Sequence, residues 1–192
     1  NPEGQFSNDF IFDVTGSKED ATQLVAQRAR ADRDIRDAIA ESIAEGNVDE
    51  LRSFLNRRQQ RGRVNERQPK SGSVPLSNAA LHGKLEIAQV LLRRGANVDG
   101  TNRDGNTALH VAAFLCHEDI VNLLLEKGAS ATKENSRGET PIDIVSGEWD
   151  EELAGFYQSI GSAVGIEIDL QRLQEARQRI AAILEGEKGA SE

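Results

Sequence analysis

A spacing of 33 residues recurs along the middle of the chain and constrains its fold more than any other feature. Gly105 follows Gly72 at this spacing, and Gly138 follows Gly105. The dipeptide Gly95–Ala96 returns as Gly128–Ala129 at the same distance. Self-similarity at a fixed period of this length indicates stacked units, each of which buries its apolar face only against its neighbours.

Each unit has the pattern of a pair of short helices. Thr107 is a suitable N-cap for the first helix of its unit, and Pro75 and Pro141 suit a first helical turn. The second helix of each unit carries the leucine pairs Leu91–Leu92 and Leu124–Leu125, which we expect to form a buried stripe between units. Pairs of alanines in the first helices allow the two helices of a unit to approach closely.

Three short motifs identify the repeat. The clearest is T-A-L-H-V-A at Thr107–Ala112, with degenerate copies at Val74–Ala79 and Thr140–Val145 and a weaker unit at Ala40–Arg57. The motif T-P-L-H-x-A at this period is that of the ankyrin repeat, and the chain resembles the ankyrin-repeat family over residues 35–147. The resemblance implies an all-α solenoid of about four helix-turn-helix repeats with short β-turn fingers and enlarged caps.

The residues outside the repeats form segments at the two ends of the chain. The carboxy-terminal unit departs from the repeat after Gly147, where we expect an inserted helix near 150–162 and a last helix capped by Asp169. A long final unit of this kind is similar to that of short bacterial ankyrin proteins. The expected segments are an extended amino-terminal arm at 1–17, a capping helix at 18–34, repeats at 35–147, an elongated carboxy-terminal cap at 148–186 and a flexible tail at 187–192.

Cys116, His117 and His110 lie close together in sequence and raise the alternatives of a thiol site, a metal site or repeat structure. A metal site needs convergent ligands at characteristic spacings, and the sequence offers none. The resemblance implies that His110 makes structural hydrogen bonds within and between repeats. It places Cys116 and His117 in the turn between the two helices of a unit, with cysteine in place of glycine. We therefore expect a structural role, no metal and no cofactor.

The composition of the chain limits the classes of partner and the locations that we expect. The formal net charge of -9 disfavours nucleic acid, and no apolar run approaches the ~18–20 residues that span a bilayer. The chain starts at Asn1 and contains no methionine, which fits either a mature exported form or a cut cytoplasmic one, so localisation stays open. No catalytic motif is present, and we expect no enzyme activity.

The resemblance implies protein binding through the concave face, made by the first helices and the turn tips. We expect a scaffold, adaptor or accessory subunit, with an inhibitor or immunity-type protein that occludes a basic enzyme as the alternative. A second possibility is that the terminal caps of the same chain cover Phe114, Leu115 and Trp149. Carried over by position, the candidate residues are Leu81, His82, Arg103, Asp104, Asn106, Phe114, Leu115, Arg137, Glu139 and Trp149.

Two further segments leave alternatives open. The arm at 1–17 either folds back on the first repeat or docks on a partner. A basic loop either forms a solvated finger or anchors an acidic partner. Its members are Arg57, Arg58, Arg61, Arg63, Arg67 and Lys70.

Overall fold

The computed structural model describes residues 18–56, 63–69, 71–164 and 169–190. The chain divides into two compact units, residues 1–38 and 39–192. The described part of the first unit consists of helix α2, Lys18–Glu45, whose last turns belong to the second unit. A single helix therefore covers the predicted capping helix at 18–34 and the first helix of the weak first repeat. The arm at 1–17 lies outside the described residues.

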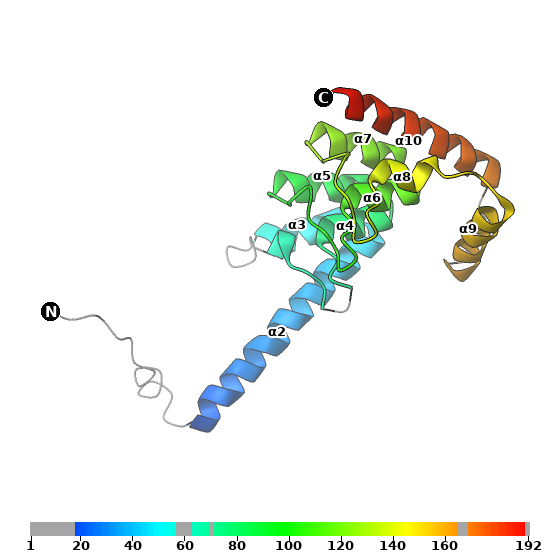
Figure 1. Ribbon diagram of the computed structural model, residues 1–192. Coiled ribbons are helices and arrows are strands. Elements are labelled where there is room, and N and C mark those ends of the chain that lie inside the picture. The colour runs from blue at the N-terminus through cyan, green and yellow to red at the C-terminus, as the bar shows by residue number, and fades with distance from the viewer. Residues whose placement is uncertain (1–17, 57–62, 70, 165–168, 191–192) are drawn as a thin grey trace. The chain divides into compact units, whose positions relative to one another are not determined.

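The second unit is a stack of helices, and its described residues form no strand (Figure 1). The predicted all-α ankyrin solenoid is confirmed. The remaining helices are α3 (Val48–Asn56), α4 (Pro75–Leu81), α5 (Leu85–Arg93), α6 (Ala108–Phe114), α7 (Glu118–Glu126), α8 (Pro141–Ser146), α9 (Glu151–Val164) and α10 (Leu170–Ala190). None of these helices, nor α2 within its described length, is long and apolar enough to cross a membrane.

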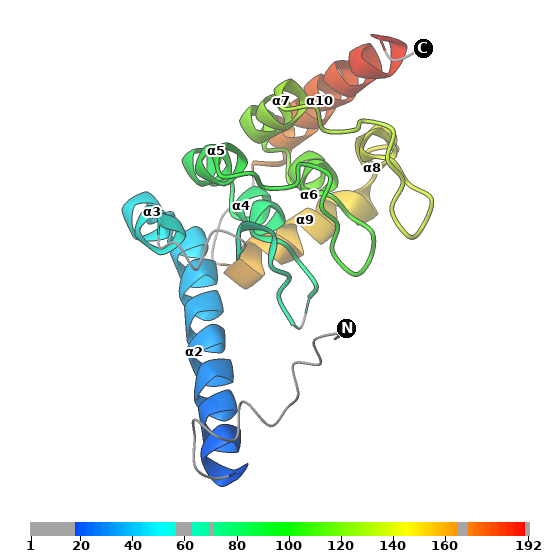
Figure 2. The ribbon, with the colours of Figure 1, turned by 90° about the vertical axis from the view of Figure 1, so that its left-hand side faces the viewer.

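The helices of this stack lie in two layers (Figure 2). The first layer contains α4, α6 and α8, which pack side by side, and we call its outer surface the first-helix face. The second layer contains α3, α5, α7 and α10, again in contact from neighbour to neighbour. Leu91 and Leu124 are fully buried between the layers, and so are the alanines at 79–80 and 112–113. Small side chains at these positions bring α4 and α6 close to their neighbours.

The fourth repeat is formed by α8 and α10, with α9 inserted between them. Helix α10 contacts both α8 and α7, so it takes the place that α7 takes in the third repeat. Asp169 caps α10 as predicted, because its carboxylate accepts hydrogen bonds from the backbone of Gln171 and Arg172, each at 3.1 Å. Helix α10 extends to Ala190, so residues 187–190, predicted as part of a flexible tail, are helical. Gly186, which directly precedes these residues, does not end the helix.

The turn tips between repeats, or fingers, join one repeat to the next at equivalent positions. The Arg103 amide lies 3.4 Å from the Ser71 carbonyl, and 33 residues later the Ser136 amide donates to the Asp104 carbonyl at 2.8 Å. Gly105 has φ +78°, and an added Cβ would lie 2.7 Å from the Ser136 nitrogen. Glycine is required there both for its left-handed backbone and for the close approach of the next finger.

Candidate functional site

His110 is buried and links the third repeat to the fourth. Its Nδ1 lies 3.2 Å from the Thr107 amide, and its Nε2 lies 3.0 Å from the Glu139 carbonyl oxygen. Since a backbone N–H only donates, Nδ1 is the acceptor and Nε2 carries the proton that is donated to Glu139. Burial lowers the pKa of His110, in keeping with a neutral ring. The predicted structural role of His110 is confirmed.

Cys116 and His117 occupy the turn between α6 and α7, as predicted. Cys116 has φ +59°, a left-handed value that the equivalent Gly83 shares at +62°. The His117 ring covers Gly83 and is hydrogen-bonded to the backbone of Leu81, and burial lowers its pKa. Burial raises the pKa of the Cys116 thiol to about 11, so the thiolate that would act as a nucleophile or metal ligand is disfavoured.

The described residues contain no cluster of three or more His, Cys, Asp or Glu side chains that would hold a metal ion. Cys116 instead directs its sulfur toward the carbonyl oxygens of Phe114 and Leu173, at 3.9 Å each. The geometry of this turn therefore gives the Cys116–His117 pair a packing role.

A groove of about 510 Å³ opens on the first-helix face. Its lining comes mainly from the first helices and the fingers of the third and fourth repeats, together with Leu81 of α4, Leu153 of α9 and Arg177 of α10. Six of the ten candidate residues line it, namely Leu81, Asn106, Phe114, Leu115, Arg137 and Glu139. The sequence also missed several lining residues, which are His110, Val111, Asp143, Ile144, Leu153 and Arg177.

The other four candidates lie elsewhere. His82 is exposed in the turn after α4, and Arg103 and Asp104 are exposed at the tip of the second finger. Arg103 and Asp104 also take part in the finger-to-finger hydrogen bonds through their backbone groups. Trp149 belongs to a different pocket. The repeat pattern places a residue on a finger or a helix face, but it does not show how wide a groove between those elements is.

An aromatic cluster holds α9 against the first-helix face. Phe114 stacks on Tyr157 with ring centroids 5.5 Å apart, and Trp149 stacks on the same ring at 6.0 Å. The Tyr157 hydroxyl donates to the Phe114 carbonyl at 2.7 Å. Tyr157 of the inserted helix thus packs on both Phe114 and Trp149 within the same chain, which favours the alternative in which the carboxy-terminal cap covers part of them. Phe114 also lines the groove, so a contact of this residue with a partner stays a prediction.

Arg177 anchors this cluster from α10 and is itself buried, with 4% of its surface exposed. Its two terminal nitrogens donate to the Tyr157 hydroxyl and the Ile144 carbonyl, each at 3.1 Å. A sequence signal for Arg177 existed. A series of residues in α10 is spaced alternately three and four apart, and all of them except Arg177 in the middle are apolar. The series is Leu170, Leu173, Arg177, Ile180 and Leu184.

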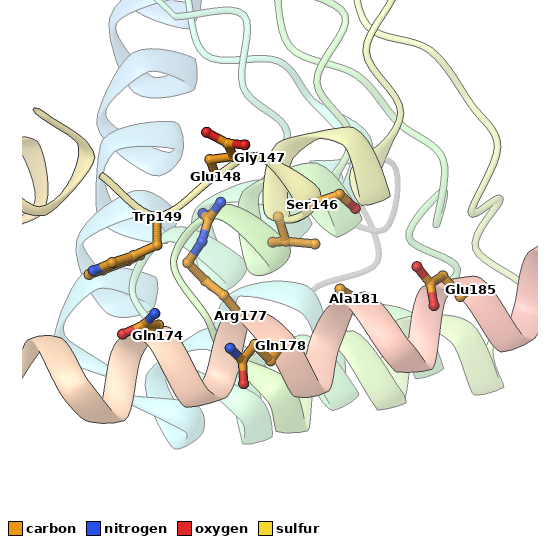
Figure 3. Close-up of a pocket in the computed structure, with 10 residues that line it drawn as sticks. Ser146, Gly147, Glu148, Trp149, Gln174, Arg177, Gln178, Ala181 and Glu185 are labelled. Carbon is orange, nitrogen blue, oxygen red and sulfur yellow. The ribbon is translucent and has the colours of Figure 1, made fainter. Parts of the chain in front are cut away.

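A second pocket, of about 550 Å³, lies between α8 and α10 (Figure 3). Arg177 extends from α10 toward the loop that carries Glu148 and Trp149, and its guanidinium carbon is 6.0 Å from the centre of the Trp149 ring. Arg177 therefore lines both the groove and this second pocket.

The described residues of the basic loop bind within their own chain. Arg63 pairs with Glu66 at 2.8 Å. Arg67 donates to the Gly72 carbonyl at 3.4 Å and to the Thr101 hydroxyl at 3.3 Å. These contacts favour the finger interpretation for Arg63 and Arg67. The other basic residues of this loop, at 57, 58, 61 and 70, lie outside the described residues.

Comparison with known proteins gives the same repeat. Residues 21–135 match the description of ankyrin repeats in three copies. The Notch-regulated ankyrin repeat-containing protein of Homo sapiens is 39% identical over 79 residues, which cover 41% of this chain and 68% of that protein. The FYVE zinc finger domain protein UPA1 of Mycosarcoma maydis is 37% identical over 83 residues, which cover 40% of this chain and 6% of that protein. Both relatives are eukaryotic and give the bacterial expectation no support.

Ankyrin repeats are generally protein–protein interaction modules. The helix pairs of the second unit, the finger contacts at equivalent positions and a match over more than half of the chain agree with one another. This chain belongs to the ankyrin-repeat family.

Proposed function

We propose that this chain binds a partner protein through the groove on the first-helix face, which is the concave face of the repeat stack, and that it acts as a scaffold, adaptor or accessory subunit. The observation that carries the proposal is the groove itself, which brings together six residues from three successive repeats. The groove has a volume of about 510 Å³.

The surface around the groove has the composition of an interface core. Leu81 is 51% exposed at the edge of the groove, and Phe156 of α9 is 49% exposed. Phe156 lies close to the groove wall, because its ring is 6.0 Å from that of Phe114 in an edge-to-face arrangement. Large apolar side chains within a rim of charged residues such as Arg137 and Glu139 resemble the hot spots of protein interfaces.

Site-specific photo-crosslinking tests the location. A benzophenone side chain placed at Leu81 should capture a partner from the native cell extract. The same group at Asn122, an exposed residue of α7 in the second layer, should not capture it. Capture of the same protein with equal yield from both positions would contradict binding through the groove.

The captured protein is then purified and its affinity measured by titration calorimetry. Leu115→Arg, which places a charge in the groove wall, should weaken binding at least about tenfold, since burying an unpaired charge is costly. Asn122→Arg adds the same charge in the second layer and should change the affinity less than about twofold. Phe114 is unsuited to this test because it also holds α9 through Tyr157.

A further inference from the structure

Arg177 is a buried cation without an anionic partner among the described residues. Its hydrogen bonds go to a tyrosine hydroxyl and a backbone carbonyl, and its guanidinium carbon lies 6.0 Å from the centre of the Trp149 ring. All three groups are neutral. Glu148 and Glu185 line the second pocket together with Arg177, but the ion pairs of the described residues do not include Arg177. Buried charges are normally paired with an opposite charge, because removal from water is costly.

The two carboxylates that line the groove are occupied by their own surroundings. Glu139 accepts hydrogen bonds from Asn135 at 2.9 Å and Arg137 at 2.8 Å, and these contacts, the Asn135 bond first, lower its pKa. Asp143 accepts the Thr140 amide at 2.8 Å and the Thr140 hydroxyl at 2.5 Å, which fixes it at the start of α8. Neither carboxylate forms an ion pair with Arg177.

Aliphatic residues contribute a large share of the groove lining. Val111 comes from α6, Leu115 from its carboxy-terminal end, Ile144 from α8 and Leu153 from α9. A side chain that enters the groove therefore meets aliphatic groups, and Arg177 lines the same groove. This arrangement is complementary to a ligand that is apolar in one part and negatively charged in the next.

We propose that the groove receives a segment of the partner protein in which an Asp or Glu side chain binds Arg177 and a neighbouring large apolar side chain packs between Leu115 and Leu153. The inference rests on the proposed function and specifies the chemistry of the partner. Arginine is well suited to this role because its planar guanidinium can bind a carboxylate through two hydrogen bonds.

The acid in this proposal is the side chain of an Asp or Glu within the partner segment. Arg177 lines both the groove and the second pocket, where it lies beside Trp149 (Figure 3). Peptides that present only internal acids distinguish such a side chain from a free carboxy terminus.

Selection from phage-displayed random dodecapeptides tests the inference, because such peptides are joined to the phage at their carboxy terminus and present only internal acids. Peptides selected on the full chain are synthesised, and their affinities are measured by fluorescence polarisation. We expect the selected sequences to share an Asp or Glu beside Leu, Ile, Phe or Trp. Conversion of that acid to its amide should weaken binding to the unaltered protein at least about tenfold.

Protein variants provide the second arm. Arg177→Gln should weaken the acidic peptide at least about tenfold and leave its amide form nearly unaffected. The matched control is Arg179→Gln, which removes an exposed arginine of α10 that pairs with Glu118 outside the groove and should change affinity less than about twofold. If Arg177→Gln does not fold, as judged by circular dichroism, the acid-to-amide peptides on the unaltered protein decide the result alone.

The outcomes separate the two proposals. Peptides that lose binding to Leu115→Arg but carry no acid, or bind equally as acid and amide, would overturn the role of Arg177 and leave the groove as the binding site. Peptides that bind Leu115→Arg as well as the unaltered protein, or the absence of any selected peptide, would count against both. Binding only by synthetic peptides with a free carboxy terminus would overturn the internal acid.

Discussion

The second and third repeats have the same backbone course but different polar side chains to support it. In the third repeat, Thr107 caps α6 and His110 reaches the next finger. In the second repeat the equivalent residues are Val74 and Ser77, and the Val74 side chain makes no capping hydrogen bond. Pro75 follows Val74, and its fixed φ and missing N–H compensate for part of the lost cap.

The comparison separates what defines the fold from what reinforces it. Buried alanines and leucines and left-handed glycines recur in both repeats. The link through His110 does not recur, and Ser77 is too short to replace it. The buried Ser77 hydroxyl has no hydrogen-bond partner among the described residues. The helix-pair geometry therefore depends on packing and turn conformation, while the polar link adds stability at one junction.

The largest expected effect comes from His110→Ala. The variant loses the bonds to Thr107 and to the Glu139 carbonyl, leaves the buried Thr107 amide without this acceptor and leaves a cavity where the ring was, so the free energy of unfolding should fall by about 2–4 kcal/mol. The Glu139 carbonyl still accepts the Asn135 amide at 2.9 Å. Urea denaturation followed by circular dichroism measures the change. A loss below about 1 kcal/mol would mean that the link between the repeats is not a major source of stability.

Gly83→Ala should cause the next largest loss of stability. An alanine at φ +62° is strained, and its Cβ would lie 2.7 Å from Cε1 of His117, so we expect a loss of about 1–3 kcal/mol. Gly95→Ala is the matched control, since its φ is +85° but no atom lies within 4 Å of the added Cβ. Equal losses in both variants would show that the contact with His117 contributes nothing beyond backbone strain.

Lower pH should weaken the third repeat more than the second. Burial lowers the pKa of His110 and His117 below the ordinary value of 6.5, whereas the second repeat has Ser77 and Lys84 at those positions. The second repeat has a single histidine, His82, which is more exposed and whose pKa is also lowered, by partial burial and by Lys84. The unfolded chain therefore binds more protons, and the stability that these residues contribute is complete above about pH 6.5 and is lost as pH falls through their folded pKa values.

Urea denaturation between pH 7.5 and 5.5, on the order of one unit on each side of the histidine pKa, checks this dependence. The double variant His110→Gln/His117→Lys removes both titrating groups and should flatten the curve relative to wild type. A wild-type chain that gains stability toward acid, relative to the variant, would contradict the assignment of neutral buried rings.

The smallest expected effect is that of Ser77→Ala, which should stabilise the chain, whereas the changes above should destabilise it. Removal of a buried hydroxyl without a partner should raise the free energy of unfolding by about 0.5–1 kcal/mol. Ser42→Ala is the control, because the equally buried Ser42 hydroxyl donates to the Ile39 carbonyl at 2.9 Å and its loss should destabilise the chain. A destabilised Ser77→Ala variant would indicate that the hydroxyl is bonded in solution.

The repeat pattern predicted the fold because it appears in the sequence with a constant spacing. The cap at Thr107 and the role of His110 follow from position within that pattern, and the inserted helix between α8 and α10 was predicted where the pattern ends. The site was predicted only where the pattern also holds, as at Leu115 and Arg137.

The course of α9 could not be predicted from the repeat. It depends on contacts between residues far apart in sequence, such as Tyr157 with Phe114 and Arg177 with Tyr157. A local pattern gives the face of a helix on which Tyr157 lies, but it does not indicate the surface on which that face packs. The sequence therefore leaves two alternatives for Phe114 and Trp149, a partner or the carboxy-terminal cap, and the structure shows that both stack on Tyr157 of the same chain.

The insertion of α9 within a single repeat also bears on how such a chain can change its recognition properties. Helices α8 and α10 contact each other in the fourth repeat, so the chain that contains α9 connects two helices that already meet. Lengthening a closed loop is inexpensive, at about 0.6 kcal/mol for each doubling of its length. This segment can therefore vary in length and sequence while the repeats stay intact. The part of the groove that α9 contributes can then change without a change in the repeats.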